Sequence, residues 1–564
     1  MPARQRLLLL QLPRLDPDVT SPGENVMLAA ACLQSALLRT AEGQQWELLP
    51  TPGAQETADN ATLLAAVLAL RPDVIGATLY LWNVERTLRL LRLIQQHLPQ
   101  VKTVVGGPEV AREHPLLFRT ATRNAADVAV VGEGEAVFPA ILAALRRSRR
   151  TNWRNVAWLQ KGQAVFGRRT PPTRPLAELL PPADHPICRP DAQGMAYLET
   201  NRGCPMRCAF CCYNLRRQGW SSLPPAEVEE RIHILRQRGT REIRLVDPTF
   251  NAHPRFRAVL GAMQRANADH RIRFFVELRA DTLTEEDAAQ LAAAHVVEAE
   301  VGIQSTDPAV LRILHRPTRL ERVLAGIERL QRHGIKPTID FMYGLPGQGL
   351  DDIEQSLAVL KRFPNAHPQF LPTLLLPGTE LRDRRQELGL RCQPLPPYRV
   401  LATDRLRPRQ LAAIEAMAEE QLGGFDSPTR RFVGQRLPDL FAARVTHGKN
   451  PLSSANRRAL FFRGEELFSQ RHAITAAIRT AVRREPDILW QFVLAPTAEE
   501  PLDLLDAIIA TIRRLPAHWL DRLVSPPGQR RVAARRLLVQ LPAGRAFDPS
   551  WQAEAETLLA GVFH

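Results

Sequence analysis

Four of the seven cysteines in this chain of 564 residues lie close together, in the stretch Asn201-Arg-Gly-Cys-Pro-Met-Arg-Cys-Ala-Phe-Cys-Cys. Cys204, Cys208 and Cys211 have the spacing CxxxCxxC, with which a short loop can place three thiolates on three irons of a [4Fe-4S] cluster. The fourth iron then has no protein ligand and can coordinate a substrate or a cofactor. A structural zinc site normally needs four protein ligands, and no second Cys or His pair follows at finger-like spacing. The motif therefore predicts an iron-sulfur cluster with one open iron.

Cys212 directly follows the motif, and we expect it to be a buried bystander thiol rather than a ligand. The other cysteines, Cys32, Cys188 and Cys392, lie far apart in the chain. Clustering of four thiols in one short stretch indicates a metal site and argues against a framework of disulfides.

The elements around the cysteine motif alternate in the βα pattern of a barrel. Strands are predicted at Met195–Thr200, Glu242–Val246, Ile272–Glu277, Val296–Gln304, Ile335–Met342 and Gln369–Leu375, with a helical stretch between each pair. Six such repeats predict an open, partial (β/α)6 TIM-like barrel over residues 191–400. The cysteine motif directly follows the first of these strands, which places it at the end of the barrel where active sites lie.

The first 150 residues show the alternation that is typical of a parallel sheet. Strands are predicted at Leu7–Leu12, Trp46–Leu49, Val74–Leu79, Val101–Val105 and Asp127–Val131. Five βα units predict a doubly wound, Rossmann-like α/β domain over residues 1–150, with ligands beyond the carboxyl ends of its strands. Those ends carry Pro13–Asn25, Tyr80-Leu81-Trp82-Asn83, Gly106-Gly107-Pro108-Glu109 and Gly132-Glu133-Gly134-Glu135. Glycines there let the backbone approach a ligand closely, although any such sheet has glycines in its tight turns.

Two further stretches complete the chain. Residues 151–190 are predicted to be a linker, because a hairpin at Val156–Phe166 is followed by a proline-rich run that opposes regular structure. Residues 401–564 have a helical pattern and are predicted to form a mainly helical C-terminal domain. No motif in that last part indicates a chemistry.

Composition and charge exclude some classes of partner. The net charge of +15 comes from arginines that are spread along the chain without a basic block, which is typical of a solvated surface and argues against a nucleic-acid track. The same surplus is compatible with an anionic or peptide substrate. No apolar run is long enough to span a bilayer, and the short apolar stretch near the start has no cleavage site behind it. We therefore expect no membrane span and a cytoplasmic location.

Over most of residues 190–400 the chain resembles the radical SAM superfamily, whose [4Fe-4S] cluster chelates the amino and carboxylate groups of S-adenosylmethionine (SAM) through its open iron. The resemblance implies that an electron, from an external donor such as a flavodoxin or ferredoxin, cleaves SAM to methionine and a 5'-deoxyadenosyl radical. It also implies that Phe210 contacts the adenine. Further matches, closest to the branch with oxygen-independent coproporphyrinogen oxidase, imply SAM-binding roles for Glu277 in FFVELRAD, Gln304 and Ser305 in VGIQS, Arg316 in ILHRP and Asp340 in TIDFMYGLPG.

These matches also have a chemical rationale, because SAM carries a sulfonium, an amino acid and a ribose diol that need charged and polar partners. In the competing interpretation, Glu277 pairs with Arg279 and Arg316 caps a helix. The family's glycine-glycine-glutamate stretch after the second strand is replaced here by Asp247-Pro248-Thr249-Phe250-Asn251, a form closer to cobalamin-dependent members. The contact to the SAM amino group is therefore left open.

The N-terminal part resembles the cobalamin-dependent branch of the same superfamily. It contains, in order, Ser21-Pro-Gly-Glu-Asn-Val-Met-Leu-Ala-Ala, then Gly106-Gly-Pro-Glu and then Gly132-Glu-Gly-Glu. The DxHxxG motif, whose histidine coordinates cobalt, is missing, since neither His97 nor His114 has that context. The resemblance thus implies a cobalamin without a histidine ligand, whose lower face meets the loop Tyr80–Asn83. The aromatic residues of that loop could equally be core packing.

The commonest reaction of such relatives is methylation of an unactivated carbon or a phosphinate phosphorus, with SAM as both radical source and methyl donor. The resemblance therefore implies a methyltransferase that uses the 5'-deoxyadenosyl radical and methylcobalamin on a small-molecule or peptide substrate. One alternative is a radical cyclase or a rearrangement enzyme without methyl transfer. Another is a non-catalytic corrinoid-binding or nucleic-acid-binding protein with a structural cluster. The C-terminal domain is expected to close over the substrate.

Overall fold

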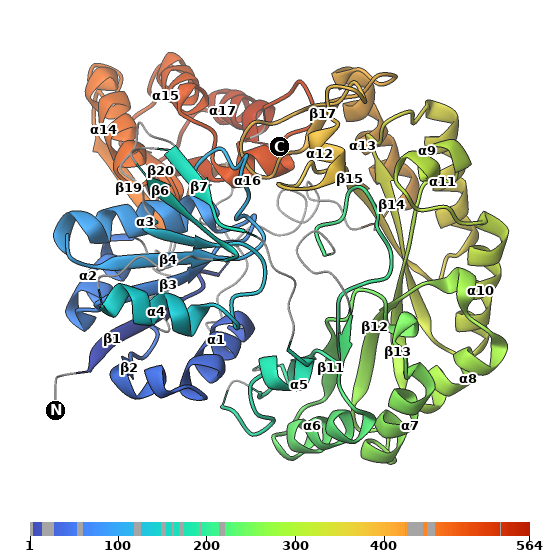
Figure 1. Cartoon of the computed structure of the whole chain (residues 1–564). Coiled ribbons are helices and arrows are strands. Elements are labelled where there is room, and N and C mark those ends of the chain that lie inside the picture. Colours follow the sequence, from blue (N-terminus) through green and yellow to red (C-terminus); the bar gives the residue numbers. More distant parts are fainter. Residues whose placement is uncertain are drawn as a thin grey trace.

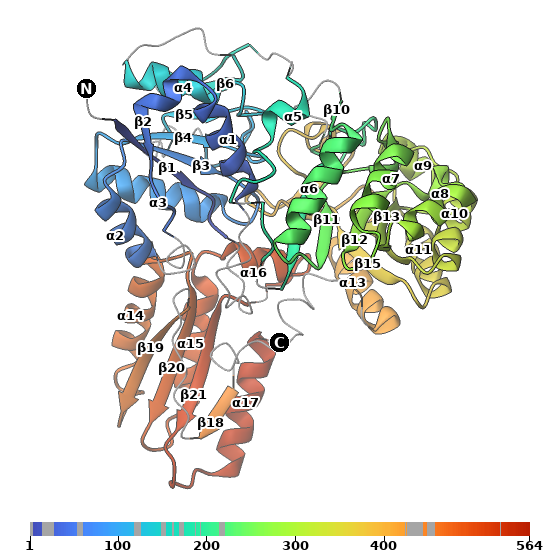
Figure 2. The ribbon, with the colours of Figure 1, turned by 90° about the horizontal axis from the view of Figure 1, so that it is seen from below.

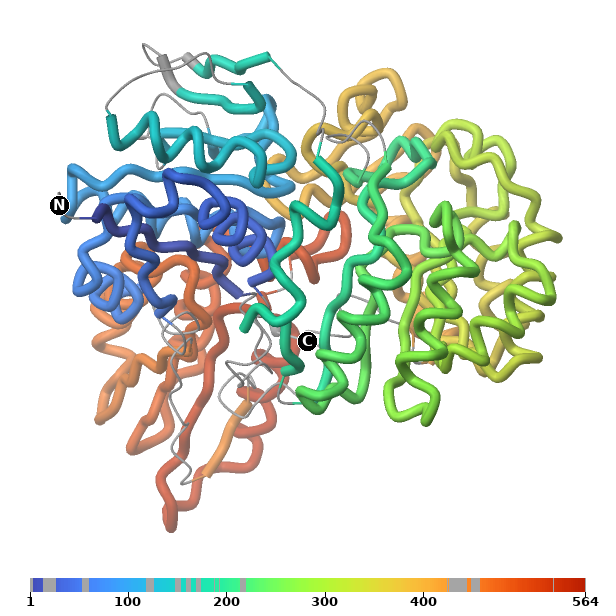
Figure 3. The backbone as a smooth tube through the Cα atoms, turned by 60° about the horizontal axis from the view of Figure 1, so that its bottom comes forward, coloured from blue at the N-terminus to red at the C-terminus, as the bar shows by residue number. Residues whose placement is uncertain are grey.

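The computed structural model describes residues 4–13, 27–52, 60–117, 126–147, 154–160, 163–168, 174–186, 188–191, 193–213, 220–423, 425, 444–447, 457–530 and 532–563. Within them the chain forms three α/β units (Figure 1), with the N-terminal sheet in blue on the left, the barrel in green to yellow on the right and the C-terminal region in orange and red. The three units are set apart when the molecule is seen from below (Figure 2), and Figure 3 traces the chain from the blue N-terminal unit through the green and yellow barrel to the orange and red C-terminal region. The predicted α/β architecture is confirmed.

The N-terminal unit is a seven-stranded sheet in the order β2-β1-β3-β4-β5-β6-β7. Its five parallel strands are those predicted from the sequence: β1 (Gln5–Leu10), β2 (Trp46–Leu48), β3 (Val74–Thr78), β4 (Lys102–Gly106) and β5 (Val128–Val130). Helices α2 (Asn60–Leu70) and α3 (Val84–His97) pack on one face, and α1 (Leu28–Leu38) and α4 (Phe138–Arg146) pack on the other. A short 3-10 helix, η2 (Ala41–Gln45), precedes β2. The domain is therefore doubly wound.

The predicted hairpin is formed by β6 (Val156–Gln160) and β7 (Gln163–Phe166), but its assignment to the linker was wrong. Strand β6 pairs antiparallel with β5, so the hairpin extends the N-terminal sheet past residue 150. The physical reason is that the outer edge of β5 has unpaired backbone groups, which an adjacent strand can satisfy. The chain then reaches the barrel through the short helix α5 (Leu176–Leu179).

The barrel is a six-stranded parallel sheet in the order β15-β14-β13-β12-β11-β8, open between its two edge strands. The strands are β8 (Met195–Leu198), β11 (Glu242–Leu245), β12 (Arg273–Leu278), β13 (Val296–Gln304), β14 (Lys336–Tyr343) and β15 (His367–Pro372). The helices around them are α6 (Pro225–Gln237), α7 (Phe256–Ala266), α8 (Glu285–Ala293), α9 (Pro308–Ile313), α10 (Leu320–Arg332) and α11 (Leu350–Arg362). Two 3-10 helices, η4 (Phe250–Ala252) and η5 (Ala280–Thr282), follow β11 and β12. The predicted six-stranded partial barrel is confirmed.

Short elements surround the carboxyl ends of the barrel strands. Strands β9 (Asn201–Arg202) and β10 (Ser221–Ser222) pair next to the cysteine motif. After β15 come α12 (Glu380–Asp383), the paired strands β16 (Arg391–Cys392) and β17 (Val400–Ala402), and helix α13 (Pro408–Leu422). These segments connect the barrel to the C-terminal region.

Helices predominate in the described C-terminal region, as predicted, but they pack on a sheet that the sequence did not indicate. Its parallel strands run in the order β18-β21-β20-β19 and are β18 (Arg444–His447), β19 (Arg457–Gly464), β20 (Leu489–Pro496) and β21 (Arg535–Leu541). The helices are α14 (Arg471–Arg484), α15 (Asp503–Arg514), α16 (Trp519–Val524) and α17 (Pro549–Phe563). Strand β20 is buried along most of its length, and a continuous apolar run of that kind cannot be told from a buried helix by periodicity.

Polar contacts join the three units. Arg89 of α3 lies 3.6 Å from the carboxylate of Asp487, and Arg522 of α16 pairs with Glu85 of α3. The buried guanidinium of Arg399 donates to Glu415 at 2.6 Å and to carbonyls beside α16, so the C-terminal region is anchored on both other units. Among the described helices, none is both long and apolar enough to cross a bilayer.

Candidate functional site

The loop with the cysteine motif is fixed at its root by Asp247, which follows β11. The buried carboxylate of Asp247 accepts the backbone N–H of Thr200 at 2.8 Å and that of Asn201 at 3.1 Å, and it also accepts the Thr200 hydroxyl. Burial raises the pKa of Asp247 to about 7, and the three hydrogen bonds oppose that rise. Asp247 belongs to the stretch that replaces the glycine-glycine-glutamate motif. Because its carboxylate accepts hydrogen bonds from Thr200 and Asn201, this stretch holds the start of the cysteine loop in place.

The three cysteines of the motif are half-buried, form no disulfide and have polar neighbours on the barrel. The Thr249 hydroxyl lies 3.4 Å from Cys204 Sγ, and Arg316 Nη1 donates to Cys208 Sγ at 3.5 Å. The backbone of the loop is held by Ala209, whose N–H donates to Leu314 O at 2.9 Å. The loop is therefore seated on the barrel with its thiols accessible, as thiolate ligands of a cluster require.

Arg316 lies between the cysteine loop and β13. Its Nη2 donates to the carbonyl of Gly302 at 2.5 Å, so its guanidinium contacts a strand and a thiol and does not cap a helix. A side chain at Gly302 would collide with the amide of Gln304, because a Cβ there would lie 2.3 Å from Gln304 Nε2. The structure thus brings the predicted Arg316 and Gln304 together beside the cysteine loop.

Three carboxyl groups face one another inside the barrel. Glu277 on β12 is directly opposite Glu300 on β13, and Asp340 on β14 is opposite Gly302, two residues along the same face of β13. Burial, followed by the charges of Glu300 and Asp247, raises the pKa of Glu277 to about 7. Burial and the neighbouring Glu300 also raise the pKa of Asp340 well above its usual range. Among the described residues Asp340 Oδ1 has no hydrogen-bond partner, so an acceptor is left for a ligand.

The alternative pairing of Glu277 with Arg279 is contradicted by the contacts of Arg279. That guanidinium pairs with Asp281 at 2.5 Å.

Ser305 is buried, and its hydroxyl donates to Asp352 at 2.7 Å, so its side chain is committed to the barrel framework. Phe210 is half-buried and packs against the barrel core. Glu300 was missed by sequence reasoning, although its spacing of two and four residues from Gly302 and Gln304 places it on the same strand face.

A cavity of about 750 Å³ lies between the N-terminal sheet and the barrel. Its N-terminal wall is formed by β1, α1 and the turns after β3, β4 and β5. The lining residues of these turns include Tyr80, Leu81, Trp82, Gly106, Gly107, Pro108, Glu109, Gly132, Glu133, Gly134 and Glu135. Its barrel wall includes Glu199, Arg202, Gly203, Cys212, Tyr213, Val246, Pro248, Leu374, Leu376 and Pro377. The predicted corrinoid residues are therefore gathered around one cavity that reaches the cysteine loop.

The loop after β3 presents an aromatic surface to this cavity. The rings of Tyr80 and Trp82 stack with centroids 4.6 Å apart, and Trp82 is 37% exposed, so it is not core packing. Asn83 does not line the cavity. Its side chain is buried, accepts the N–H of Tyr80 at 2.8 Å and donates to Leu12 O at 2.9 Å, and it thereby fixes the shape of the loop.

The turn after β4 requires glycine. Gly107 has φ of +106°, and a Cβ on it would lie 2.6 Å from the carbonyl oxygen of Leu79. Of the predicted stretch Ser21–Ala30, residues 21–26 lie outside the described part of the chain, as do residues 14–25 of Pro13–Asn25. Leu28, Ala29 and Ala30, the last residues of that stretch, line the cavity.

No histidine is among the described residues that line the cavity. His114 is buried, its Nε2 lies 3.0 Å from Glu109 Oε2 and its Nδ1 accepts the N–H of Leu116 at 3.2 Å. Both of its ring nitrogens are thus engaged. Cys212 was expected to be buried, but it is half-buried because the loop directs it toward this cavity.

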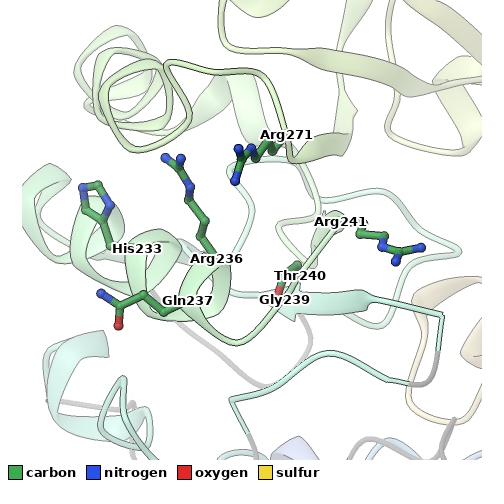
Figure 4. Close-up of a pocket in the computed structure, with 7 residues that line it drawn as sticks. All are labelled: His233, Arg236, Gln237, Gly239, Thr240, Arg241 and Arg271. Carbon is green, nitrogen blue, oxygen red and sulfur yellow. The ribbon is translucent and has the colours of Figure 1, made fainter.

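A second hollow, of about 730 Å³, lies at the opposite end of the barrel (Figure 4). It is lined by His233, Arg236, Gln237, Gly239, Thr240, Arg241 and Arg271, and Arg236 and Arg271 both pair with Asp269. Arg241 and Arg271 lie just before β11 and β12, at the amino ends of those strands. This hollow is therefore separate from the cysteine loop.

Comparison with known proteins agrees with this division of the chain. The Radical SAM superfamily model matches residues 198–360, and the B12 binding domain model matches residues 35–142. The first implies a [4Fe-4S] cluster and SAM, and the second implies cobalamin. The apolar cavity with its glycine turns fits a corrinoid, and the loop with the accessible thiols of Cys204, Cys208 and Cys211 fits a [4Fe-4S] cluster.

Two curated methyltransferases each match about half of the chain. The chain is 29% identical over 298 residues to 2-(S-pantetheinyl)-carbapenam-3-carboxylate methyltransferase of Streptantibioticus cattleyicolor. The aligned region covers 49% of this chain and 43% of that protein. It is 25% identical over 348 residues to the cobalamin-dependent radical SAM methyltransferase TokK of Streptomyces tokunonensis, covering 58% and 50%. The chain thus spans about half the length of these curated relatives.

Among solved structures, the fold is similar to that of the radical SAM methyltransferase TsrM of Kitasatospora setae with cobalamin and a [4Fe-4S] cluster bound. The TM-score is 0.56 at 18% identity, over 69% of this chain and 77% of that one. The chain therefore has a region that matches the B12 binding domain model, followed by a region that matches the Radical SAM superfamily model, and its fold is similar to that of a protein that binds cobalamin and a [4Fe-4S] cluster.

Proposed function

We propose that the protein is a cobalamin-dependent radical SAM methyltransferase that acts on an unactivated carbon of a small-molecule or peptide substrate. The observation that carries the proposal is the shared cavity, whose walls include the three glycine-bearing or aromatic turns of the N-terminal sheet and residues of the cysteine loop. When bound, the cluster and SAM supply a 5'-deoxyadenosyl radical and cobalamin supplies a methyl group. A substrate in this cavity would lie within reach of both.

On the barrel side, Cys204, Cys208 and Cys211 would hold the cluster. Asp340 would accept the ribose hydroxyls of SAM through Oδ1, which has no partner among the described residues. Glu277, which is half-buried on β12, would face the positively charged methionine end of SAM. Thr249 and Arg316 lie beside the thiols of Cys204 and Cys208, where the amino acid group of SAM would bind.

Three further residues of the predicted SAM set have distinct roles in this proposal. Phe210 would contact the adenine from the cysteine loop. Gln304 would position Arg316, because its amide group fills the space above Gly302 beside that guanidinium. Ser305 would act only through Asp352, to which its hydroxyl is committed.

On the corrinoid side, the backbone at Gly106–Pro108 and Gly132–Gly134 would border the ring. The stacked Tyr80 and Trp82 would cover its lower face, with Leu81 beside them and Asn83 holding the loop. None of these residues offers a nitrogen to cobalt in the way that a histidine does.

We also propose that a flavodoxin or ferredoxin supplies the electrons and that the protein is cytoplasmic. Support for the second point comes from the seven cysteines, none of which forms a disulfide. Cysteines without disulfides are typical of a reducing compartment.

The proposal is tested by anaerobic reconstitution with iron, sulfide and hydroxocobalamin, followed by mass spectrometry of the products of SAM. Deoxyadenosine together with S-adenosylhomocysteine is expected for methyl transfer. Deoxyadenosine alone would instead indicate cyclisation or rearrangement. Formation of neither product would contradict a radical enzyme and leave a binding protein.

A further inference from the structure

The glutamate of the Gly106–Glu109 turn lines the cavity, and its carboxylate contacts a tyrosine that follows the barrel in the chain. Glu109 Oε2 accepts the hydroxyl of Tyr398 at 2.8 Å and lies 3.0 Å from Nε2 of His114. All three side chains are buried. Tyr398 belongs to the segment between β16 and β17, which follows the barrel, so this contact joins two units of the chain.

The other side of this contact is part of the cavity wall. The carbonyl of Tyr398 accepts the N–H of Leu375 at 3.0 Å, and the guanidinium of Arg382 lies 4.4 Å above the Tyr398 ring. Arg382 also donates to Leu375 O at 2.6 Å, and the adjacent residues Leu374 and Leu376 line the cavity. The hydroxyl of Tyr398 therefore ties the turn after β4 to the barrel wall opposite it.

A second contact of the same kind involves the turn after β5. Glu135 Oε1 accepts Nη1 of Arg202 at 2.8 Å, and the carboxylate of Glu133 lies 3.7 Å from the same nitrogen. The other edge of the Arg202 guanidinium donates to both oxygens of Glu199 at 2.8 Å. Arg202 is two residues before Cys204, so this ion pair joins the turn to the cysteine loop itself.

We propose that Tyr398 with Glu109 and Arg202 with Glu135 are two interdomain clamps, which set the separation and orientation of the corrinoid turns relative to the cysteine loop. Glu109 and Glu135 are then positioning residues, and the glycines beside them form the surface that meets the corrinoid. The inference rests on the proposed cofactor sites. It follows from the direction of the two carboxylates, each of which is engaged by a barrel-side group at short distance.

The test compares Tyr398→Phe, which removes one hydroxyl, with Tyr343→Phe. Tyr343 is also buried, and its hydroxyl accepts Nη2 of Arg399 at 2.8 Å, whereas the Tyr398 hydroxyl contacts both Glu109 and His114. None of the hydrogen bonds given for the described part of the chain joins Tyr343 to a corrinoid turn. The full-length proteins are reconstituted anaerobically and reduced. Bound corrinoid per chain is measured after gel filtration, and the magnetic coupling between cob(II)alamin and the reduced cluster is measured by pulsed electron paramagnetic resonance (EPR).

For Tyr398→Phe we expect full retention of corrinoid and cluster but a shifted magnetic coupling between them, with loss of methyl transfer relative to deoxyadenosine formation. Tyr343→Phe should match the wild type in all these measurements. Glu135→Gln, which keeps the size of the side chain, should shift the coupling in the same way. Loss of corrinoid from either clamp variant would overturn the proposal by making these residues part of the binding site, and so would an unchanged coupling.

The proposed function and the clamps fail in different ways. Failure of the wild type to retain corrinoid would contradict the proposed function. Wild-type protein that binds both cofactors and couples them, together with a Tyr398→Phe variant of identical coupling, would contradict only the clamps. A global loss of folding in Tyr398→Phe would be seen as loss of the cluster too, and Glu135→Gln then decides the question by the same coupling measurement.

Discussion

The mouth of the barrel carries three carboxyl groups on neighbouring strands and an arginine next to a thiol, whereas the cavity against the N-terminal sheet has leucine, alanine, proline and glycine over much of its wall. In our proposal, the first surface would recognise a ligand through individual polar side chains. The second would recognise a ligand through backbone and apolar area, where shape matters more than any single polar group. The difference suits a charged cofactor such as SAM on one side and a large corrinoid ring on the other.

This difference determines how each site should respond to mutation. Removing one charged side chain from the barrel mouth should weaken binding in proportion to one hydrogen bond or ion pair. Adding volume to a glycine turn should disturb the whole surface, because neighbouring backbone has to move. The predictions below use paired variants to separate the two behaviours.

The largest effect is expected from the cysteine motif. Replacing Cys204, Cys208 or Cys211 with Ala should abolish deoxyadenosine formation and most of the visible absorbance of the cluster, since we expect each of the three thiolates to hold one iron. Cys212→Ala is the matched control, because this half-buried thiol lies in the same loop and should leave both signals intact. Loss of the cluster in the Cys212 variant, with retention in one of the other three, would reverse the assignment.

The next effect concerns the glycine turns. Gly107→Ala should cause loss of corrinoid after gel filtration, because the new Cβ would lie 2.6 Å from a backbone oxygen and the turn would have to move. Gly239→Ala is the control: Gly239 also has a positive φ, of +84°, but no atom lies within 4 Å of the new Cβ. Its cost should be limited to about 1 to 2 kcal/mol of backbone strain, with corrinoid retained. Equal retention by both variants would show that the turn does not border the corrinoid.

A smaller effect is expected from the barrel carboxylates. Asp340→Ala should weaken SAM binding by up to roughly a hundredfold with the cluster intact, because leaving a buried hydrogen-bonding group without its partner costs about 1 to 3 kcal/mol. Glu298→Gln is the control, since Glu298 lies on β13 and already accepts the Thr338 hydroxyl at 2.8 Å. Equilibrium binding of SAM to the reconstituted proteins measures both. The same affinity in both variants would make Asp340 a structural residue only.

The strands and the cysteine loop could be predicted because their signals are local. Short apolar runs, regular helical stretches and the spacing of Cys204, Cys208 and Cys211 are all contained in a few neighbouring residues. Glu300 could not be assigned in that way, because a polar residue in a strand has a role only once its partners across the sheet are known. The sheet of the C-terminal region was missed for a related reason, since β20 is apolar on both faces.

The contacts between the units were beyond the reach of the sequence. Glu109 and Glu135 were assigned to the cofactor because they lie in motifs that resemble a family. Their partners Tyr398 and Arg202 are far away in the chain, and only the packing of the units shows which way the carboxylates point. The hairpin β6–β7 illustrates the same point, because its attachment to β5 depends on an edge that the sequence does not reveal.

The pH dependence of SAM binding should distinguish the charged site from the apolar one. Since burial, with Glu300 and Asp247, raises the pKa of Glu277 to about 7, this carboxyl is protonated at lower pH and must lose its proton to attract cationic SAM. SAM affinity should therefore fall as the pH drops below about 7, by up to about tenfold per pH unit. Glu277→Gln should bind more weakly with a flatter profile. A wild-type profile that is level from pH 6 to 8 would contradict a role for this charge.

The smallest expected effect is on the cobalt itself, because we expect no histidine nitrogen to reach it. Incorporation of 15N-histidine should leave the EPR spectrum of the cob(II)alamin form unchanged. The label separates a protein imidazole from the cofactor's own benzimidazole, whose nitrogen stays 14N. His114 contacts the cavity-lining residue Glu109, but both of its ring nitrogens are engaged. The described residues that line the cavity include no histidine. A change in nitrogen splitting on labelling would place a histidine on cobalt and would contradict the aromatic surface of Tyr80 and Trp82 as its lower face.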